Sequence, residues 1–229
     1  MTKKLYVLLL PVLIVFVATG TTANQLIKHD APLVQVTDSQ WDTIDINVRI
    51  DGIDSREVKT RGGTFTRLMV DRDAFKGDIG SPRIPVIRKM VEVPYGAEIR
   101  LEYQVQNVQT QNLDYPLIPV QAPVPKLPGA LEAAPFDMNS VVYARNQYIS
   151  EPGVRIQDID YMRGHRLVVL EITPVGYNPA QNEIRTADGF DIRLEMSGSD
   201  PDLTQQMDYR YYNPVFETLL TEKVLNHGA

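Results

Sequence analysis

The sequence predicts an all-β fold, a sandwich of two mainly antiparallel sheets followed by a short C-terminal helix. Three observations lead to this prediction. Apolar and polar residues alternate along several short segments, and turn-forming glycine, proline and aspartate residues separate these segments. A helical spacing of apolar residues is found close to the end of the chain, after residue 212.

The length of the chain suits one domain with one sizeable core. It has 229 residues, of which 43% are hydrophobic. We expect a leader over residues 1–23, the sandwich over residues 24–205, and a helix with linker over residues 206–229. Stability has to come from packing, because the chain contains no cysteine and cannot form a disulfide.

The first 23 residues have the features of a signal peptide. Lys3 and Lys4 precede an apolar run over residues 5–17, and small residues follow up to Ala23. The run is shorter than the roughly 20 apolar residues that span a bilayer, so we expect cleavage after Ala23, with Gly20 as a second candidate. A retained N-terminal anchor is the alternative. Cleavage predicts a secreted protein, extracellular or at the bacterial cell surface, that no longer contacts the membrane.

Strands are predicted along the first half of the domain. Residues 42–50 place four aliphatic side chains on one face, and turns at residues 51–52 and 61–63 lead to a further strand over residues 64–70. Pro82 and Pro85 keep the next segment extended. A turn at residues 94–96 then precedes an alternating strand that contains Ile99, Leu101, Tyr103 and Val105.

Residues 107–135 are predicted to form one long extended loop. The alternation fades here, and the stretch contains six prolines. Loops of this length inside compact domains are usually functional or mobile.

The second half again predicts strands, over residues 141–143, 154–159 and 166–173. The last of these is apolar on both faces, so we expect Val169 and Leu170 to be buried on opposite sides of a central strand. Residues 190–196 alternate and are expected to pair with it as a hairpin or sheet neighbour. Finally, Asn213 and Pro214 predict the cap and first residue of a helix of about three turns.

No catalytic or metal site is predicted. Without cysteine there is no thiol nucleophile, and His29, His165 and His227 are far apart in the sequence, so we expect three surface histidines and no cofactor. Two carboxylate pairs, Asp71 with Asp73 and Asp158 with Asp160, have a spacing that calcium could use. Alternation on an exposed strand face explains the same spacing.

The charge of the chain argues against a nucleic-acid partner. The formal net charge is −6, and no stripe of lysine and arginine is present that could displace counterions from phosphates.

Three motifs together resemble the prodomain of gingipain-type cysteine peptidases. They are Pro-Arg-Ile-Pro-Val at residues 82–86, Val-Pro-Tyr-Gly at residues 93–96 and Pro-Val-Gly-Tyr-Asn-Pro at residues 174–179. The resemblance extends from Asp45 to Met196. It implies a temporary inhibitor and intramolecular chaperone, with the C-terminal helix leading to a catalytic domain that lies downstream or on another chain.

The resemblance also implies an inhibitory loop. In this family a loop in this part of the fold carries a basic residue into the specificity pocket of the peptidase, and Lys126, between Pro125 and Leu127, falls at the matching place. Flanking prolines reduce the entropy lost on insertion. A lysine that is merely solvated is the alternative interpretation, and Arg145 is the second candidate for the basic residue.

A secreted β-sandwich that binds surface glycans or proteins is the second functional hypothesis. Exposed aromatic residues would favour it. Trp41 lies before the main strands, and we expect Tyr209, Tyr211 and Tyr212 to pack against the C-terminal helix.

Overall fold

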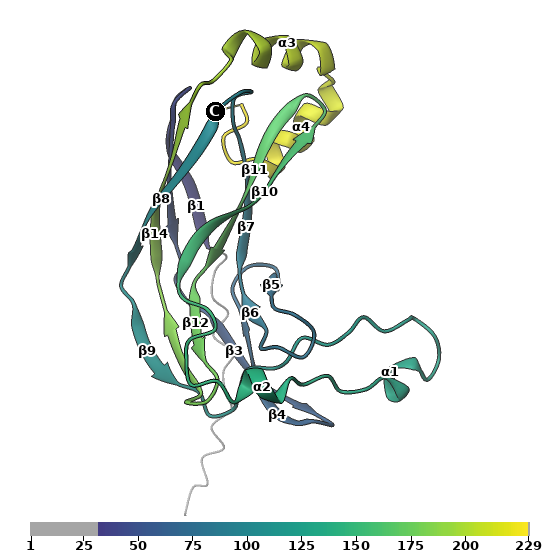
Figure 1. Cartoon of the computed structure of the whole chain (residues 1–229). Coiled ribbons are helices and arrows are strands. Elements are labelled where there is room, and N and C mark those ends of the chain that lie inside the picture. Colours follow the sequence, from purple (N-terminus) through teal and green to yellow (C-terminus); the bar gives the residue numbers. More distant parts are fainter. Residues whose placement is uncertain (1–31, 229) are drawn as a thin grey trace, which may run out of the picture.

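The computed structural model describes residues 32–228, as an elongated body of antiparallel sheets with the two C-terminal helices at one end and two short helices toward the other (Figure 1). The predicted signal peptide over residues 1–23 and His29 lie outside the described residues. No helix between residues 32 and 228 is both long and apolar enough to cross a membrane.

One layer of the body is a four-stranded sheet with the order β1-β2-β14-β8. Its strands are β1 (Leu33–Ser39), β2 (Thr43–Arg49), β8 (Glu98–Gln106) and β14 (Gly189–Ser197). The predicted alternation is confirmed in β2 and β14, where every second side chain is buried. These inward residues are Ile44, Ile46 and Val48 from β2, and Phe190, Ile192, Leu194 and Met196 from β14.

The facing layer is a three-stranded sheet with the order β10-β11-β7. Its strands are β7 (Ile87–Glu92), β10 (Gly153–Met162) and β11 (His165–Thr173). The main hydrophobic core contains apolar side chains from both layers, so the sandwich prediction is confirmed. The predicted pairing of β11 with β14 is wrong, since the two strands belong to opposite layers.

The central position predicted for β11 is confirmed, because it pairs with β10 on one side and β7 on the other. Leu170 is fully buried, whereas Val169 is only half-buried. The prediction that both side chains are buried is therefore wrong for Val169. Leu167 and Glu171 on the same side of the strand are buried, so the incomplete cover is local to Val169 and leaves Leu170 as the core residue of the pair.

A corner joins the two layers between β7 and β8. Pro94 is buried, and Gly96 has a φ of 74°, a left-handed conformation that glycine adopts without strain. The backbone of Tyr95 is held at this corner by the start of a helix, because its N–H donates to Thr204 Oγ1 at 3.0 Å. The predicted turn is confirmed, and it carries the chain from one sheet to the other.

Smaller sheets lie at the other end of the body. They comprise β3 (Asp54–Thr60) paired with β4 (Gly63–Met69), β5 (Phe75–Lys76) paired with β6 (Ile84–Pro85), and β13 (Glu183–Thr186) between β9 (Gln109–Asn112) and β12 (Val175–Asn178). A second core here includes Leu117 and Tyr177, both fully buried. Leu117 belongs to the proline-rich stretch over residues 107–135, so this part of the predicted loop is packed into a hydrophobic core.

Four helices are present among residues 32–228: α1 (Ala130–Ala133), α2 (Ser140–Tyr143), α3 (Pro201–Tyr211) and α4 (Pro214–Lys223). The predicted α4 is confirmed, with Asn213 as its cap. The strand predicted over residues 141–143 is wrong, because the Asn139 side chain caps a helical turn there. The tyrosines near α4 do not pack against it as expected: Tyr209 is 89% exposed and Tyr212 is 65% exposed.

Among residues 32–228, neither carboxylate pair belongs to a group of three or more side chains that could hold a metal ion together. Asp71 is paired with Lys89, and Asp73 is paired with Arg67 and Arg83. Asp158 and Asp160 are exposed, and each accepts a hydrogen bond from the backbone of the next residue.

A buried carboxylate joins the middle strand to its neighbours. Glu171 is fully buried on β11, and its carboxylate forms ion pairs with Arg88 from β7 and Arg155 from β10. The nitrogen–oxygen distance is 2.8 Å in each pair. Burial alone would raise the pKa of Glu171, but hydrogen bonds from the two arginines outweigh burial and lower that pKa.

Candidate functional site

The proline-rich stretch contains a loop over residues 122–136 that projects away from the sandwich (Figure 1). Its two ends are joined by side chain to backbone hydrogen bonds. Gln121 Nε2 donates to the Asp137 carbonyl at 2.8 Å, and the Asp137 N–H donates back to Gln121 Oε1 at 3.1 Å. The Ala122 N–H donates to Asp137 Oδ2 at 3.1 Å. We call these three bonds the clasp.

Further contacts fix the returning end of the loop to the β3–β4 hairpin. Phe136 packs on Phe65 with ring centroids 5.6 Å apart, and the Arg61 guanidinium donates to the Ala134 carbonyl. A Cβ at Gly62 would lie 2.1 Å from the Phe136 ring, so this close approach requires glycine. The loop therefore protrudes from a fixed base.

Lys126 lies on the outgoing half of this loop, exposed together with Pro125 and Leu127. The Leu127 side chain is 68% exposed, and the Leu127 N–H donates to the Pro125 carbonyl at 2.9 Å, which forms a tight turn at the lysine. Among residues 32–228, Lys126 forms no ion pair. Its ammonium group is therefore available to a carboxylate on another molecule.

Arg145, the second candidate, lies outside this loop. It follows α2 and is exposed, and its carbonyl accepts a hydrogen bond from the Ala180 N–H at 3.2 Å. The α2 segment is attached to the body through Asn139, whose N–H donates to the Gly80 carbonyl at 2.8 Å. Lys126 and Arg145 are thus presented by separate segments, one protruding and one fixed to the body.

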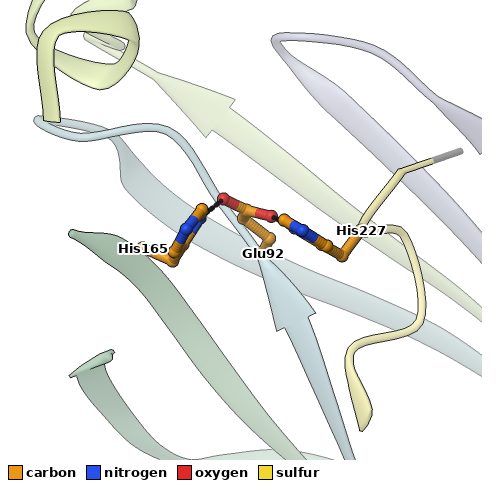
Figure 2. Close-up of side chains that lie close together, drawn as sticks. All are labelled: Glu92, His165 and His227. Atoms are coloured by element: carbon orange, nitrogen blue, oxygen red, sulfur yellow. Dashed lines mark hydrogen bonds and ion pairs between the residues drawn. The ribbon is translucent and has the colours of Figure 1, made fainter. Parts of the chain in front are cut away.

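A second polar cluster was missed by the sequence analysis. Figure 2 shows Glu92 between His165 and His227, with each histidine Nδ1 2.6 Å from one carboxylate oxygen. The prediction of surface histidines is wrong for these two, because the His165 side chain is 4% exposed and that of His227 is 13% exposed. Burial would lower the pKa of His227, but hydrogen bonds with Glu92 and Glu217 outweigh burial and raise that pKa.

Three parts of the fold supply this cluster. Glu92 ends β7, His165 begins β11, and His227 follows α4. The tail after α4 runs beside β7, where the Leu225 N–H donates to the Met90 carbonyl at 2.9 Å and Asn226 makes two hydrogen bonds with the Glu92 backbone. The only sequence signal was the presence of an acid and two histidines; their spacing indicated no common site.

The fold and the clasped loop together define a class of protein: an antiparallel β-sandwich that presents a basic residue on a protruding segment. Comparison with protein-family models matches Propeptide_C25 over residues 24–222. The chain belongs to this family of peptidase propeptides.

Relatives and solved structures agree with this assignment. The chain is 29% identical over 201 residues to Lys-gingipain HG66 of Porphyromonas gingivalis, a match that spans 85% of this chain and 12% of that protein. A solved structure that concerns zymogenic latency of gingipain K from the same organism is 26% identical, with a TM-score of 0.64, over 76% of this chain and 97% of that one.

A second solved structure is a complex of the Porphyromonas gingivalis RgpB pro- and mature domains. It has a TM-score of 0.68 over 87% of this chain and 100% of that one. Its sequence identity of 15% makes it evidence for the fold alone. The predicted all-β prodomain fold and the family resemblance are confirmed.

Proposed function

We propose that this chain is the exported propeptide of a gingipain-type cysteine peptidase, which it inhibits temporarily and helps to fold. The partner is the peptidase catalytic domain, in cis or in trans. The observation that carries the proposal is the exposed Lys126 on a loop that is clasped at its base and protrudes from the sandwich. A protruding fixed loop can enter a concave pocket that a flat sheet cannot enter.

Inhibition through this loop depends on its order before binding. A loop that is already held in its bound shape loses less conformational entropy on insertion, so more of the contact energy appears as affinity. Pro125 and Pro128 restrict the backbone on both sides of Lys126, and Leu127 offers an apolar side chain next to the ammonium group. In the pocket, the ammonium should face a carboxylate or a ring of carbonyl groups.

The test is inhibition of the mature peptidase by purified variants. Truncation of an interface anchor commonly costs about 2 kcal/mol or more, so Lys126→Ala should raise the inhibition constant about thirtyfold. Lys59 is the matched control: its side chain is 82% exposed on the β3–β4 hairpin, and Lys59→Ala should leave inhibition within about fivefold of wild type. Lys76 is unsuitable because it contacts Thr173 and Glu171.

Each other result has a definite meaning. Equal inhibition by wild type and Lys126→Ala removes Lys126 from the mechanism. A loss of inhibition in Arg145→Ala instead moves the anchor to Arg145 and keeps the propeptide function.

Export is the remaining part of this proposal. The Lys3-Lys4 start, the short apolar run and the small residues before Asn24 support a cleaved signal peptide. N-terminal sequencing of protein recovered outside the cell should begin near Asn24, whereas material that still begins with Met1 would favour the retained anchor.

The second candidate function is a surface-binding module for glycans or proteins. Tyr209, Tyr212 and Val215 favour it, since they are 89%, 65% and 83% exposed around the junction of α3 and α4. Failure of the wild-type domain to inhibit the mature peptidase would favour this function over the propeptide.

A further inference from the structure

The cavity next to the Glu92 cluster gathers five titratable side chains from separate parts of the fold. It has a volume of about 530 Å³ and is lined by Glu92, His165, Asp208, Glu217 and His227, among others. Two imidazoles and three carboxylates form a donor set that suits borderline divalent transition metals, because imidazole selects zinc-type ions and carboxylates accept them.

The compact part of this set is Glu92, His165 and His227. One ligand atom from each lies within 4.8 Å of the others. In a tetrahedral zinc site with bonds of about 2.0–2.1 Å, neighbouring ligand atoms are roughly 3.3 Å apart. Each histidine Nδ1 is 2.6 Å from one oxygen of Glu92, so these two nitrogen–oxygen contacts would have to lengthen by about 0.7 Å to reach the spacing of a zinc site.

Two buried atoms beside this group lack hydrogen-bond partners. One is Nε2 of His165, on a side chain that is only 4% exposed and that lines the cavity. The other is Asp208 Oδ1, which lies 3.6 Å from His165 Nδ1. A buried polar atom without a partner is costly, and an ion bound by Asp208 Oδ1 would remove this cost at the carboxylate. Asp208 is not among the three residues whose ligand atoms all lie within 4.8 Å of one another, so it becomes a fourth ligand when its side chain moves toward the ion.

Glu217 occupies the position of an outer carboxylate. Its Oε2 lies 2.9 Å from His227 Nε2, and its Oε1 lies 3.7 Å from His165 Nε2. Metal-ligating histidines usually donate their other ring N–H to a carboxylate, which fixes the ring and its tautomer. Both rings of this cluster therefore have their second nitrogen directed toward the same acid.

From this geometry we propose a divalent transition-metal site of the zinc type, with ligands Glu92, Nδ1 of His165, Nδ1 of His227 and Asp208. Glu217 orients the two imidazoles from outside the ligand shell. The ion fastens the tail after α4, and the helix α3 that carries Asp208, to the ends of β7 and β11. The sequence alone predicts no metal site, since these ligands are spread over residues 92–227.

The first test is zinc binding by the full chain without an affinity tag, freed of metal with a chelator that is then removed. Titration calorimetry should give one Zn²⁺ per chain, and the melting temperature should rise with zinc concentration because the ion binds only the folded state. Ca²⁺ at the same concentration should do neither, because it prefers oxygen ligands. No zinc binding up to 1 mM would overturn the proposal.

Variants then assign the site. Loss of an outer-shell partner alone weakens metal binding by roughly 10- to 100-fold, so His227→Gln and Asp208→Asn should weaken it by at least this factor. Glu222→Gln, an exposed acid on α4, is the matched control and should bind zinc as wild type does. Wild-type affinity in His227→Gln would show that zinc binds elsewhere.

A folding defect is excluded by circular dichroism and melting of the metal-free variants. His227 follows the last helix, so His227→Gln is expected to keep the sandwich intact. If metal-free His227→Gln proves unfolded, the zinc affinity of Asp208→Asn is the decisive measurement. A decrease of at least tenfold supports the proposed site. An affinity equal to that of wild type shows that Asp208 is not a ligand. Co²⁺ provides an independent readout, because a tetrahedral nitrogen and oxygen shell gives strong visible absorption that an exposed carboxylate cluster does not.

Discussion

Gln121→Ala tests whether the clasp orders the inhibitory loop. The substitution removes both hydrogen bonds between the Gln121 side chain and the Asp137 backbone, together with a longer one of 3.2 Å from Gln121 Nε2 to the Pro119 carbonyl, and leaves the Ala122 bond to Asp137 Oδ2 in place. A hydrogen bond contributes about 0.5–1.5 kcal/mol net, and these exposed bonds belong near the lower end. The loss should total about 1–2 kcal/mol.

This loss should appear in the affinity for the peptidase rather than in global stability. A free energy of 1–2 kcal/mol corresponds to an inhibition constant raised about 5- to 30-fold. The residues of the loop from 122 to 136 belong to neither large core, so the free energy of unfolding should change by less than about 1 kcal/mol. Gln35→Ala, which changes an exposed glutamine on β1, should alter neither quantity.

Two measurements distinguish the order of the loop from its affinity for the peptidase. Amide hydrogen exchange should become faster at Ala122 and Asp137, whose N–H groups donate within the clasp. Faster exchange with an unchanged inhibition constant would refute the link between loop order and affinity. Unchanged exchange would refute the clasp itself.

Three predictions concern stability. Glu171→Gln should lower the free energy of unfolding in urea by about 2–3 kcal/mol. This is less than the roughly 3–5 kcal/mol expected when one partner of a fully buried ion pair is removed, because Arg88 and Arg155 reach water. A loss below about 1 kcal/mol would contradict a stabilising role for the Glu171 ion pairs. Because the folded-state pKa of Glu171 is lowered, its stabilisation should be present above its ordinary pKa and disappear as pH falls through the folded value, and wild type and Glu171→Gln should converge in acid. Leu170→Asp should prevent folding, whereas Val169→Asp should give a soluble protein that unfolds cooperatively, and equal behaviour would refute the burial difference.

Local patterns predicted the long strands β2, β4, β8, β10, β11 and β14 and the helix α4, because alternation and capping depend on neighbouring residues. The same rule would have found α3, which begins with an Asp200 cap and Pro201 just as α4 begins with Asn213 and Pro214. The Val141-Val142-Tyr143 run has high strand propensity, but the Asn139 cap outweighs it locally.

Features that depend on distant pairing could not be predicted from the sequence. The partners of β11 and β14 are set by which layer each strand joins, and alternation alone does not specify a partner strand. The Glu92 cluster forms only because the tail folds back along β7, more than 130 residues away in sequence. Lys126 lies on an exposed loop, as the sequence predicts. Its role as the inhibitory residue is part of the proposed function.

The strand order predicts that the domain stays folded after cleavage within the loop over residues 122–136. The exposed Lys126–Leu127 bond separates two halves of the chain, yet each layer contains strands from both halves. In one layer β14 lies between β2 and β8, and in the other β11 lies beside β7. A nicked chain would therefore remain assembled as two interleaved fragments, held by the same core. Cleavage of this bond would separate the two ends of the loop but would not unfold the sandwich. Dissociation of the cleaved domain from a peptidase would therefore require further cleavage or a loss of affinity at the loop.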